Sequence, residues 1–462
     1  MNSLLRTIPK VDDILRHDGW NVISKTYPES IAKNALRSFL EELRCSIKDG
    51  KISILPSIGE IIRSVEIKIK SILTPRLKRV INGTGVIIHT NLGRSLLSKA
   101  AIEAVVNAAS FYTNLEYDLN KGSRGDRYVH CTFILQKLTG AEGALVVNNN
   151  AGAVFLILNT LAEGKESIIS RGELVEIGGS FRIPDIMKKS GAVLKEVGTT
   201  NRTFIDDYEY AINESTGLLM KAHPSNFRIR GFIHEATGDE IVSLSKKYNL
   251  PSYYDAGSGM LFPLEKVGSH DEPCITEELK KGWDLISFSG DKLLGSPQAG
   301  IILGEKTYID VLKKNPITRM LRPDKFTLAA LETTLLHYLD EDYARKEIPT
   351  LRMLYEKNDV LKKRAQMFAR KIRKLSDKLN IMIIEVSSEI GGGSLPDIFI
   401  PSFAVALKPV FISVSEFEKR LRDLEVPIIA RIEKDMLCLN MRTIVKEDEA
   451  LIVKGIEQVL LN

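Results

Sequence analysis

The chain has 462 residues, of which 44% are hydrophobic, so it can bury a large core and should form two or three domains. It contains no run of eighteen apolar residues, and its first residues lack the apolar segment of a signal peptide. We therefore expect a cytoplasmic protein with no membrane partner. The four cysteines are widely spaced and the seven histidines show no metal-binding spacing, which argues against a disulfide framework and against a metal site.

A helical, basic module is predicted over residues 1–80. The segment from Pro28 to Gly50 has the apolar spacing of an amphipathic helix and ends at a glycine. Residues 1–80 hold 15 Lys and Arg against 9 Asp and Glu, a net charge of +6, while the whole chain carries +5. Such a module can attract the phosphate backbone of a nucleic acid, and a solvated helical surface is the structural alternative.

A large α/β domain is predicted over residues 81–345. Apolar strands alternate with helical segments at ALVV, SIIS, AVLKEV, GLLMKAH, PSYYDA, LISFS and AGIIL, which indicates a mainly parallel sheet covered by helices. Only nine residues separate the last two strands, too few for a helical crossover, so AGIIL should run antiparallel. A seven-stranded mixed sheet of this kind resembles the large domain of the fold-type I pyridoxal phosphate transferases.

A smaller α+β domain is predicted over residues 346–462. A long helical stretch from Leu328 to Leu375 leads into it, and helices are also predicted from Val414 to Leu421 and from Glu447 to Leu460. Between them the apolar runs IMIIEV, FAVALK, VPIIARI and MLCLNM predict strands. The chain is therefore expected to have three parts, of which the α/β domain is the largest.

One lysine, Lys292, lies on a glycine-rich turn between two apolar strands, in SFSGDKLLGSPQAGIILG. Lysine is seldom buried, so this side chain either reaches to water or takes part in chemistry. The chemical interpretation is a Schiff base, in which the free amine attacks the aldehyde of pyridoxal phosphate. Partial burial favours it, because desolvation lowers the pKa of a lysine. A lysine on a surface turn is the alternative.

Two other segments contain anchors for such a cofactor. The strand ALVV leads into NNNAGAV, and Asn149, Asn150 and Ala151 stand where a helix begins, so that backbone N–H groups there can hold a phosphate. Ordinary capping of the helix by Asn150 is the structural alternative. Asp255 ends the strand PSYYD at the carboxyl edge of the sheet and can face a pyridine nitrogen, or it can simply cap the following turn.

Five long motifs occur in order along the chain: INGTGVIIHTNLGR, LTGAEGALVVNNNAGAV, SRGELVEIGGSFRIPDIM, VGTTNRT and SFSGDKLLGSPQAG. Together they closely resemble the bacterial selenocysteine synthase family, the L-seryl-tRNA(Sec) selenium transferases, and the resemblance covers essentially the whole chain. It implies conversion of seryl-tRNA(Sec) to selenocysteinyl-tRNA(Sec), with pyridoxal phosphate as cofactor and selenophosphate as selenium donor. Water leaves the seryl group first, and selenium adds to the resulting dehydroalanyl-tRNA.

The resemblance also implies residue roles and an assembly. Lys292 corresponds to the lysine that binds pyridoxal phosphate covalently. Arg94 in NLGR, and Arg319 and Arg322 in TRMLRPDK, correspond to arginines that bind the selenium donor. Guanidinium groups suit this role, because they bind phosphate oxygens in pairs. A ring-shaped homodecamer built from dimers is implied, with active sites at the dimer interfaces and the N-terminal module on the tRNA.

Further residues near these motifs have two interpretations each. Asp291, beside the lysine, can assist proton transfer or only orient the turn. Ser289 can reach the cofactor phosphate or form a hydrogen bond inside the turn. Arg124 and Arg127, in GSRGDRYVH, can reach a phosphate of a neighbouring subunit, and a structural ion pair is the alternative.

Three positions depart from the family pattern. Ser296 stands where a second glycine often follows KLLG, Pro224 stands where threonine is common, and Asp126 replaces a small residue. All three leave the candidate cofactor residues intact. A carboxylate at Asp126 would oppose a bound anion if it faced the site.

Two rival functions fit parts of the sequence. A pyridoxal phosphate lyase acting on a small amino acid or an amino sugar acid would be expected to lack the N-terminal module and the donor arginines. Such an enzyme would usually hold the substrate carboxylate with an arginine, and Arg431 or Arg442 can serve that role. A tRNA-binding protein that kept the fold without catalysis is the non-enzymatic alternative.

Overall fold

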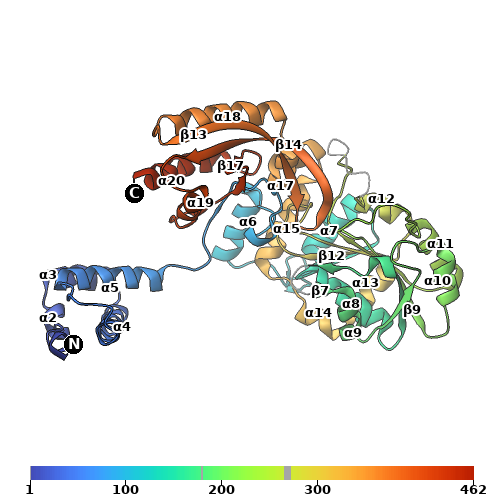
Figure 1. Ribbon diagram of the computed structural model, residues 1–462. Coiled ribbons are helices and arrows are strands. Elements are labelled where there is room, and N and C mark those ends of the chain that lie inside the picture. Colours follow the sequence, from blue (N-terminus) through green and yellow to red (C-terminus); the bar gives the residue numbers. More distant parts are fainter. Residues whose placement is uncertain (1, 178–180, 265–271, 462) are drawn as a thin grey trace. The chain divides into compact units, whose positions relative to one another are not determined.

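The computed structural model describes residues 2–177, 181–264 and 272–461 (Figure 1). The chain divides into two compact units, Met1–Arg79 and Val80–Asn462. The predicted division of the second unit at residue 345 stays a prediction. Each unit has its own hydrophobic core and is described by itself.

The first unit is helical. Its helices are α1 (Asn2–Arg6), α2 (Val11–Leu15), α3 (Asp18–Thr26), α4 (Glu29–Lys48) and α5 (Ile58–Leu73). Helix α4 confirms the amphipathic helix predicted from Pro28 to Gly50, and its buried face packs with that of α5 in one core cluster. Helix α5 begins with a capping box, in which Ser57 and Glu60 satisfy each other's backbone N–H groups.

The second unit is built on a seven-stranded sheet. Its strands are β4 (Gly143–Val147), β5 (Glu166–Ser170), β8 (Val193–Val197), β9 (Thr216–Ala222), β10 (Ser252–Gly257), β11 (Leu285–Ser289) and β12 (Gly300–Gly304). They lie in the order β4-β12-β11-β10-β9-β5-β8. Strand β12 runs antiparallel to both β11 and β4, while the other pairs are parallel. The predicted seven-stranded mixed sheet is therefore confirmed, including its antiparallel last strand.

Helices cover both faces of this sheet (Figure 1). They are α6 (Lys99–Ser110), α7 (Val129–Thr139), α8 (Asn150–Ala162), α9 (Ile183–Ser190), α10 (Ile205–Ala211), α11 (Gly238–Tyr248), α12 (Ile275–Lys280), α13 (Lys306–Lys314), α14 (Pro316–Met320) and α15 (Lys325–His337). Alternate residues of one strand enter different core clusters, for example Ile301 and Leu303 in one and Ile302 in the other. Both faces are buried, which explains why these strands are continuously apolar in sequence.

A four-stranded antiparallel sheet, in the order β13-β14-β17-β16, follows in the chain. This region comprises α16 (Glu341–Glu347), α17 (Pro349–Tyr355), α18 (Asn358–Arg373), β13 (Leu379–Gly391), β14 (Ser394–Pro409), α19 (Val414–Arg422), β15 (Ile428–Ile429), β16 (Arg431–Glu433), β17 (Met436–Asn440) and α20 (Glu449–Leu461). The predicted helical stretch consists of four helices, α15 to α18, because Asp340 caps α16 and Pro349 begins α17. The predicted strand VPIIARI is split, since β15 pairs with β1 (Ile81–Asn82) and β16 pairs with β17.

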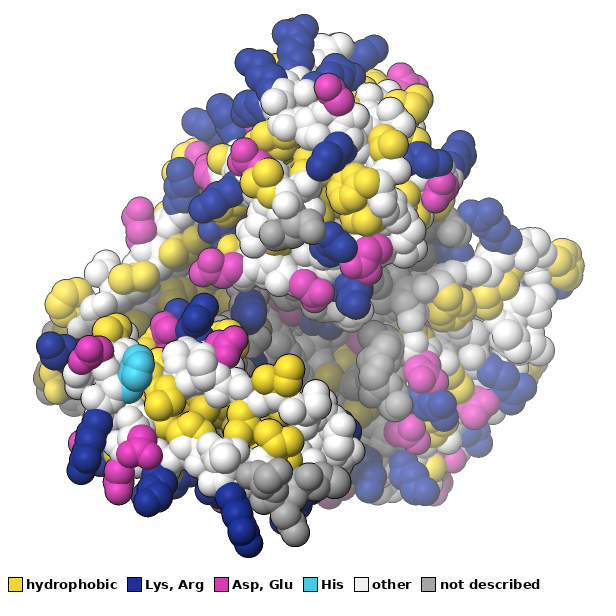
Figure 2. Space-filling view, turned by 60° about the vertical axis from the view of Figure 1, so that its left-hand side comes forward, with side chains coloured by type: hydrophobic (Ala, Val, Ile, Leu, Met, Phe, Trp, Pro, Cys, Tyr) yellow, Lys and Arg dark blue, Asp and Glu magenta, His cyan; other side chains and the backbone are white. Residues whose placement is uncertain are grey.

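Positive charge is concentrated on α18 as well as in the first unit. Residues 357–378 contain nine Lys and Arg and two Asp, a net charge of +7. Figure 2 shows Lys and Arg side chains crowding the upper part of the view, where α18 lies in Figure 1. This second basic segment does not show in the net charge of residues 81–462, because acidic residues elsewhere in that range offset it.

Several features are absent from the described residues. No helix of residues 2–177, 181–264 or 272–461 is long and apolar enough to cross a bilayer. The same residues hold no cluster of three or more His, Cys, Asp or Glu side chains that could bind a metal ion. The four cysteines are free thiols, of which Cys45 is exposed and the others are buried.

A buried ion pair joins two segments at the carboxyl edge of the sheet. Glu173, just after β5, accepts a hydrogen bond of 2.7 Å from the Lys221 ammonium of β9 and another of 3.0 Å from the Ala222 N–H. Lys221 also donates to the Ala236 carbonyl. The two ionic side chains are only 5% and 12% exposed. The pair therefore fixes the loop after β5 against the end of β9.

We expect Lys221→Met to lower the free energy of unfolding by about 3 kcal/mol, because it leaves Glu173 as a buried carboxylate without its counter-charge. Urea unfolding followed by circular dichroism measures the change. Lys195→Met is the matched control, since Lys195 is 41% exposed and 3.6 Å from Glu166, and it should cost less than about 1 kcal/mol. Equal losses in the two variants would contradict the importance of burial.

Candidate active site

Lys292 lies at the carboxyl edge of the seven-stranded sheet, on the turn between β11 and β12. It is 4% exposed and lines a cavity of about 210 Å³. Other residues predicted for the site line the same cavity: Arg94, Asn149, Asn150, Ala151, Asp255, Ser289 and Asp291. The structure therefore brings eight of the ten predicted site residues together, and their roles stay predictions.

The first turn of α8 contributes two asparagines with different functions. The Asn149 side chain caps the helix by accepting a 2.8 Å hydrogen bond from the Gly152 N–H. The Asn150 amide instead donates a 2.9 Å hydrogen bond to Asp255 Oδ1. Capping by Asn150, the alternative considered from sequence, is therefore wrong. Asn150 Oδ1 is buried and has no hydrogen-bond partner among the described residues.

Asp255 is buried at the end of β10, 6% exposed. Burial raises the pKa of its carboxyl group, while the hydrogen bonds from Asn150 and from the Gly257 N–H and the positive charge of Lys292 act in the opposite direction. A cationic group brought into the cavity would favour the ionised form further. The carboxylate is thus placed to pair with a protonated ligand nitrogen.

The amine of Lys292 is shifted towards its neutral form. Burial lowers the pKa of Lys292 below its usual value; Asp255 acts to raise it and the nearby Arg94 guanidinium to lower it. The net direction is downward, so a larger fraction of the amine is unprotonated near neutral pH than for an exposed lysine. An unprotonated amine is the form that attacks a carbonyl carbon.

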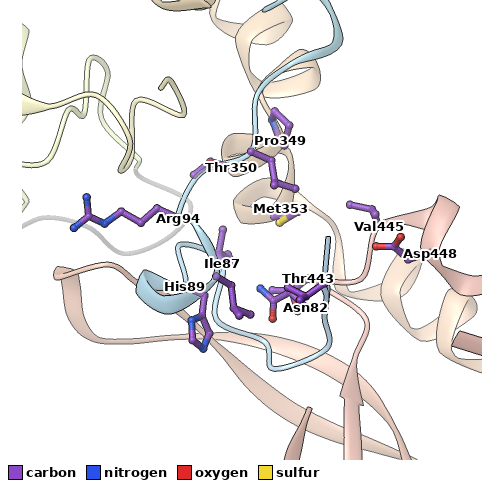
Figure 3. A pocket seen from close by; sticks show the side chains of 13 residues that line it. Asn82, Ile87, His89, Arg94, Pro349, Thr350, Met353, Thr443, Val445 and Asp448 are labelled. Atoms are coloured by element: carbon purple, nitrogen blue, oxygen red, sulfur yellow. The ribbon is translucent and has the colours of Figure 1, made fainter. Parts of the chain in front are cut away.

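Arg94 reaches this cavity from a tight loop that follows the short helix Thr90–Leu92. Its backbone has a φ of 61°, in the left-handed region that few residues other than glycine adopt. Its Nη1 lies 2.6 Å from Asp291 Oδ2. In Figure 3, which shows a neighbouring cavity of about 80 Å³, the Arg94 side chain points away from the other labelled side chains.

Arg319 and Arg322 are not brought to the Lys292 cavity. Arg319 is exposed on α14. Arg322 lies 3.3 Å from Glu116, which also pairs with Arg127 at 2.6 Å and lies 3.8 Å from Arg124. The Arg127 hydrogen bond is the main reason that the pKa of Glu116 is lowered. Three guanidinium groups thus surround one carboxylate, which leaves an excess of positive charge at this surface.

The cavity has further lining residues that the sequence analysis did not select, among them His223, Ser225 and Gln298. His223 directly follows β9, and its Nε2 is 3.5 Å from the buried carboxylate of Glu272. His223 could have been predicted from its position, because it directly follows a strand whose carboxyl end lies at the same sheet edge as Asp255. Gln298 and Ser225 carry no comparable signal in one sequence.

None of the three departures from the family pattern replaces a residue that lines the Lys292 cavity. Asp126 is exposed, and its side chain accepts a hydrogen bond from the Tyr128 N–H at the start of α7. Ser296 is fully buried and donates to the Gly290 carbonyl, which ties the Lys292 turn together. Pro224 lines a separate small cavity. Asp126 does not line the Lys292 cavity, but its charge acts on Tyr128 together with those of Arg127 and Arg322, so its opposition to an anion at these arginines stays a prediction.

Both arginines considered for a substrate carboxylate already have partners. Arg442 is buried, and its guanidinium donates to the carbonyls of Met353, Glu356 and Pro401. Its Nε has no hydrogen-bond partner among the described residues. Arg431 forms a 2.7 Å ion pair with Glu389. A substrate carboxylate would therefore have to compete with these partners.

A solved structure shares this fold. D-glucosaminate-6-phosphate ammonia-lyase matches with a TM-score of 0.56 at 20% identity, over 88% of this chain and 98% of that chain. With the observed order of the seven strands, this match confirms the predicted fold class, that of the fold-type I pyridoxal phosphate transferases with a helical N-terminal module and a sheet-rich C-terminal region. At this identity the likeness concerns the fold alone.

Sequence comparisons identify the family. The family model described as L-seryl-tRNA selenium transferase matches residues 80–445, and one described as selenocysteine synthase N terminal matches residues 5–44. An L-seryl-tRNA(Sec) selenium transferase of Aquifex aeolicus is 50% identical over 100% of both chains. One of Clostridium botulinum (strain Okra / Type B1) is 47% identical over 99% of both. The chain therefore belongs to the L-seryl-tRNA selenium transferase family.

Proposed function

We propose that the chain converts seryl-tRNA(Sec) to selenocysteinyl-tRNA(Sec) with selenophosphate as the selenium donor and pyridoxal phosphate as the cofactor. One observation carries the proposal. A buried lysine shares a cavity with a buried aspartate and a capped helix N-terminus, in a chain that matches selenium transferases over its full length.

The residues of the cavity fit pyridoxal phosphate. The N-terminus of α8 points backbone N–H groups towards a phosphate, and the unpaired Oδ1 of Asn150 can accept a hydrogen bond from a donor group of the ligand. Asp255 can pair with the pyridine nitrogen, and Lys292 can bind the aldehyde. When bound, the cofactor supplies an electron sink for the electrons left at the substrate α-carbon.

The protein supplies the acid–base chemistry. The lowered pKa of Lys292 lets its amine accept the α-proton of the seryl group and return a proton later. Asp291, next in the chain and 10% exposed at its side chain, lies at the same turn. The departing hydroxyl leaves as water. The selenium of the donor then adds to the β-carbon, a proton returns to the α-carbon, and water cleaves the P–Se bond so that inorganic phosphate leaves.

The arginines support a phosphate-bearing donor. Arg94 is in the Lys292 cavity, whereas Arg319 and Arg322 are outside it in the same chain. We propose that these two, with Arg124 and Arg127, serve the site of a neighbouring subunit. That arrangement agrees with the dimer-built homodecamer that the family resemblance implies.

An aminoacyl ester is favoured over a free amino acid as substrate. A free amino acid carries an α-carboxylate, and enzymes that bind one generally pair it with an arginine. Among the arginines considered for this role, Arg442 donates to three carbonyls and Arg431 pairs with Glu389. The ester of seryl-tRNA(Sec) has no such charge to satisfy.

Two basic surfaces support a tRNA partner in the cytoplasm. The first unit carries exposed arginines such as Arg37 and Arg44 on α4, and α18 carries Lys363 and Arg370. Basic helices bind nucleic acid backbones by releasing condensed counterions. We propose that both surfaces contact the tRNA.

Replacement of the lysine tests the cofactor chemistry. Lys292→Ala removes the amine, so the protein should lose the visible absorbance of a lysine-linked cofactor, and turnover should fall about a thousandfold. Absorption spectra after reconstitution with pyridoxal phosphate and single-turnover assays measure both effects. Lys306→Ala, which removes an exposed lysine of α13, is the control and should change neither. An unchanged spectrum in Lys292→Ala would contradict the assignment.

The substrate is tested directly. Purified protein with pyridoxal phosphate and selenophosphate should convert seryl-tRNA(Sec) to selenocysteinyl-tRNA(Sec), and should leave free serine unchanged because its carboxylate would compete with the existing partners of Arg442 and Arg431. Product release from the tRNA followed by amino acid analysis detects the change. Turnover of free serine alone would favour a lyase instead.

Charge reversal tests the tRNA surfaces. The double variants Arg37→Glu/Arg44→Glu and Lys363→Glu/Arg370→Glu should each weaken tRNA binding about tenfold and flatten its dependence on salt, because phosphate contacts release counterions. Filter binding at several salt concentrations measures this. Lys314→Glu, an exposed lysine of α13, is the control. Binding unchanged by either double variant would exclude that surface.

A further inference from the structure

Arg94 already has an anionic partner inside the cavity. Its Nη1 lies 2.6 Å from Asp291 Oδ2, and the two side chains are 30% and 10% exposed. Asp291 is the one carboxylate within ion-pair distance of Arg94 among the described residues. The guanidinium edge that would bind a phosphate-bearing donor is thus occupied, at least in part, by a carboxylate of the same chain.

The backbone around this pair is fixed on both sides. The Ser95 hydroxyl lies 2.9 Å from the Asp291 carbonyl and 2.7 Å from the Lys292 carbonyl. Arg94 itself has the left-handed φ of 61°. Because Ser95 ties the loop to the Lys292 turn, an anion can separate the pair by rotating the Asp291 side chain, without a shift of either segment.

We propose that Asp291 acts as an internal competitor for the anion-binding side of Arg94, and that a phosphate-bearing donor must displace it. The inference rests on the proposed function and deepens it. Donor binding then releases the Asp291 carboxylate beside Lys292, where it can accept a proton. Asp291 is thus a second proton acceptor besides Lys292, and it becomes available only when the tetrahedral anion is in place.

Displacement of Asp291 from Arg94 by an anion has an electrostatic effect on Lys292 whose direction can be stated. Arg94 acts to lower the pKa of Lys292, and Asp291 acts to raise it. An anion on Arg94 adds negative charge near Lys292 and frees the Asp291 carboxylate from its partner. Both changes favour the protonated form of a nitrogen at Lys292. Anion binding should therefore raise the pH at which the visible spectrum of the holoenzyme changes.

Inorganic phosphate is the probe for this competition. The holoenzyme is titrated with phosphate at constant ionic strength, and the visible absorption of the lysine-linked cofactor is followed at a pH near its midpoint. In Asp291→Asn, which keeps the shape and removes the charge, phosphate should bind at least about fivefold more tightly than in the unchanged protein. Asp291→Ala is the second variant and should change affinity in the same direction.

Two control variants locate the effect. Arg94→Gln should abolish the spectral response to phosphate. Glu196→Gln removes the carboxylate from another arginine pair, 2.9 Å from Arg171 and outside the cavity, and should leave phosphate affinity unchanged.

Equal or weaker phosphate binding in both Asp291 variants would overturn the proposal, because Asp291 would then be neutral to the anion site or help to form it. The absence of a phosphate response in every variant would overturn it too. If the unchanged protein fails to acquire visible absorbance with pyridoxal phosphate, the proposed function itself fails, which is a distinguishable result.

Discussion

Burial of the Lys292 ammonium group is the constraint on which the site depends. A buried ammonium is costly unless it is neutralised or paired. The antiparallel strand β12 places Lys292 at the sheet edge beside Asp255. Glycine at position 300 is required there, because a Cβ atom would overlap the Asn149 carbonyl oxygen. Close approach of β12 to the start of α8 thus brings Asn150 within hydrogen-bond distance of Asp255.

The charged groups at the cavity act on one another. Asp255, Glu272 and Asp291 act to raise the pKa of Lys292, and Arg94 acts to lower it. Asp255 is held by hydrogen bonds from the first turn of α8 and from its own turn, so its position is fixed. Among the described residues, Arg94 alone forms a hydrogen bond to the Asp291 side chain. Asp255 therefore keeps the same partners, while Asp291 can exchange Arg94 for another partner when a ligand binds.

Much of this arrangement follows from sequence because it depends on local patterns. Seven apolar runs predict the sheet, and the short connection after LISFS predicts the antiparallel strand that carries Lys292 to its position. Side-chain partners are harder to predict, since a row of asparagines does not reveal that Asn149 caps the helix while Asn150 binds Asp255. The position of Arg322 beside Glu116 depends on segments 206 residues apart, which no local pattern encodes.

The C-terminal region bears on the choice of substrate, because an arginine there that could bind a carboxylate already has hydrogen-bond partners. Arg442 lies in the part of the chain that follows the large sheet, where it could bind a carboxylate, yet its guanidinium donates to carbonyls of α17, of the residue after it and of β14. Burial lowers the pKa of Arg442 to about 10, although the nearby Glu356 carboxylate acts to raise it. A carboxylate bound by Arg442 would have to compete with these carbonyls for Nη1 and Nη2, whereas Nε has no hydrogen-bond partner among the described residues. An ester-linked seryl group has no negative charge that requires this competition.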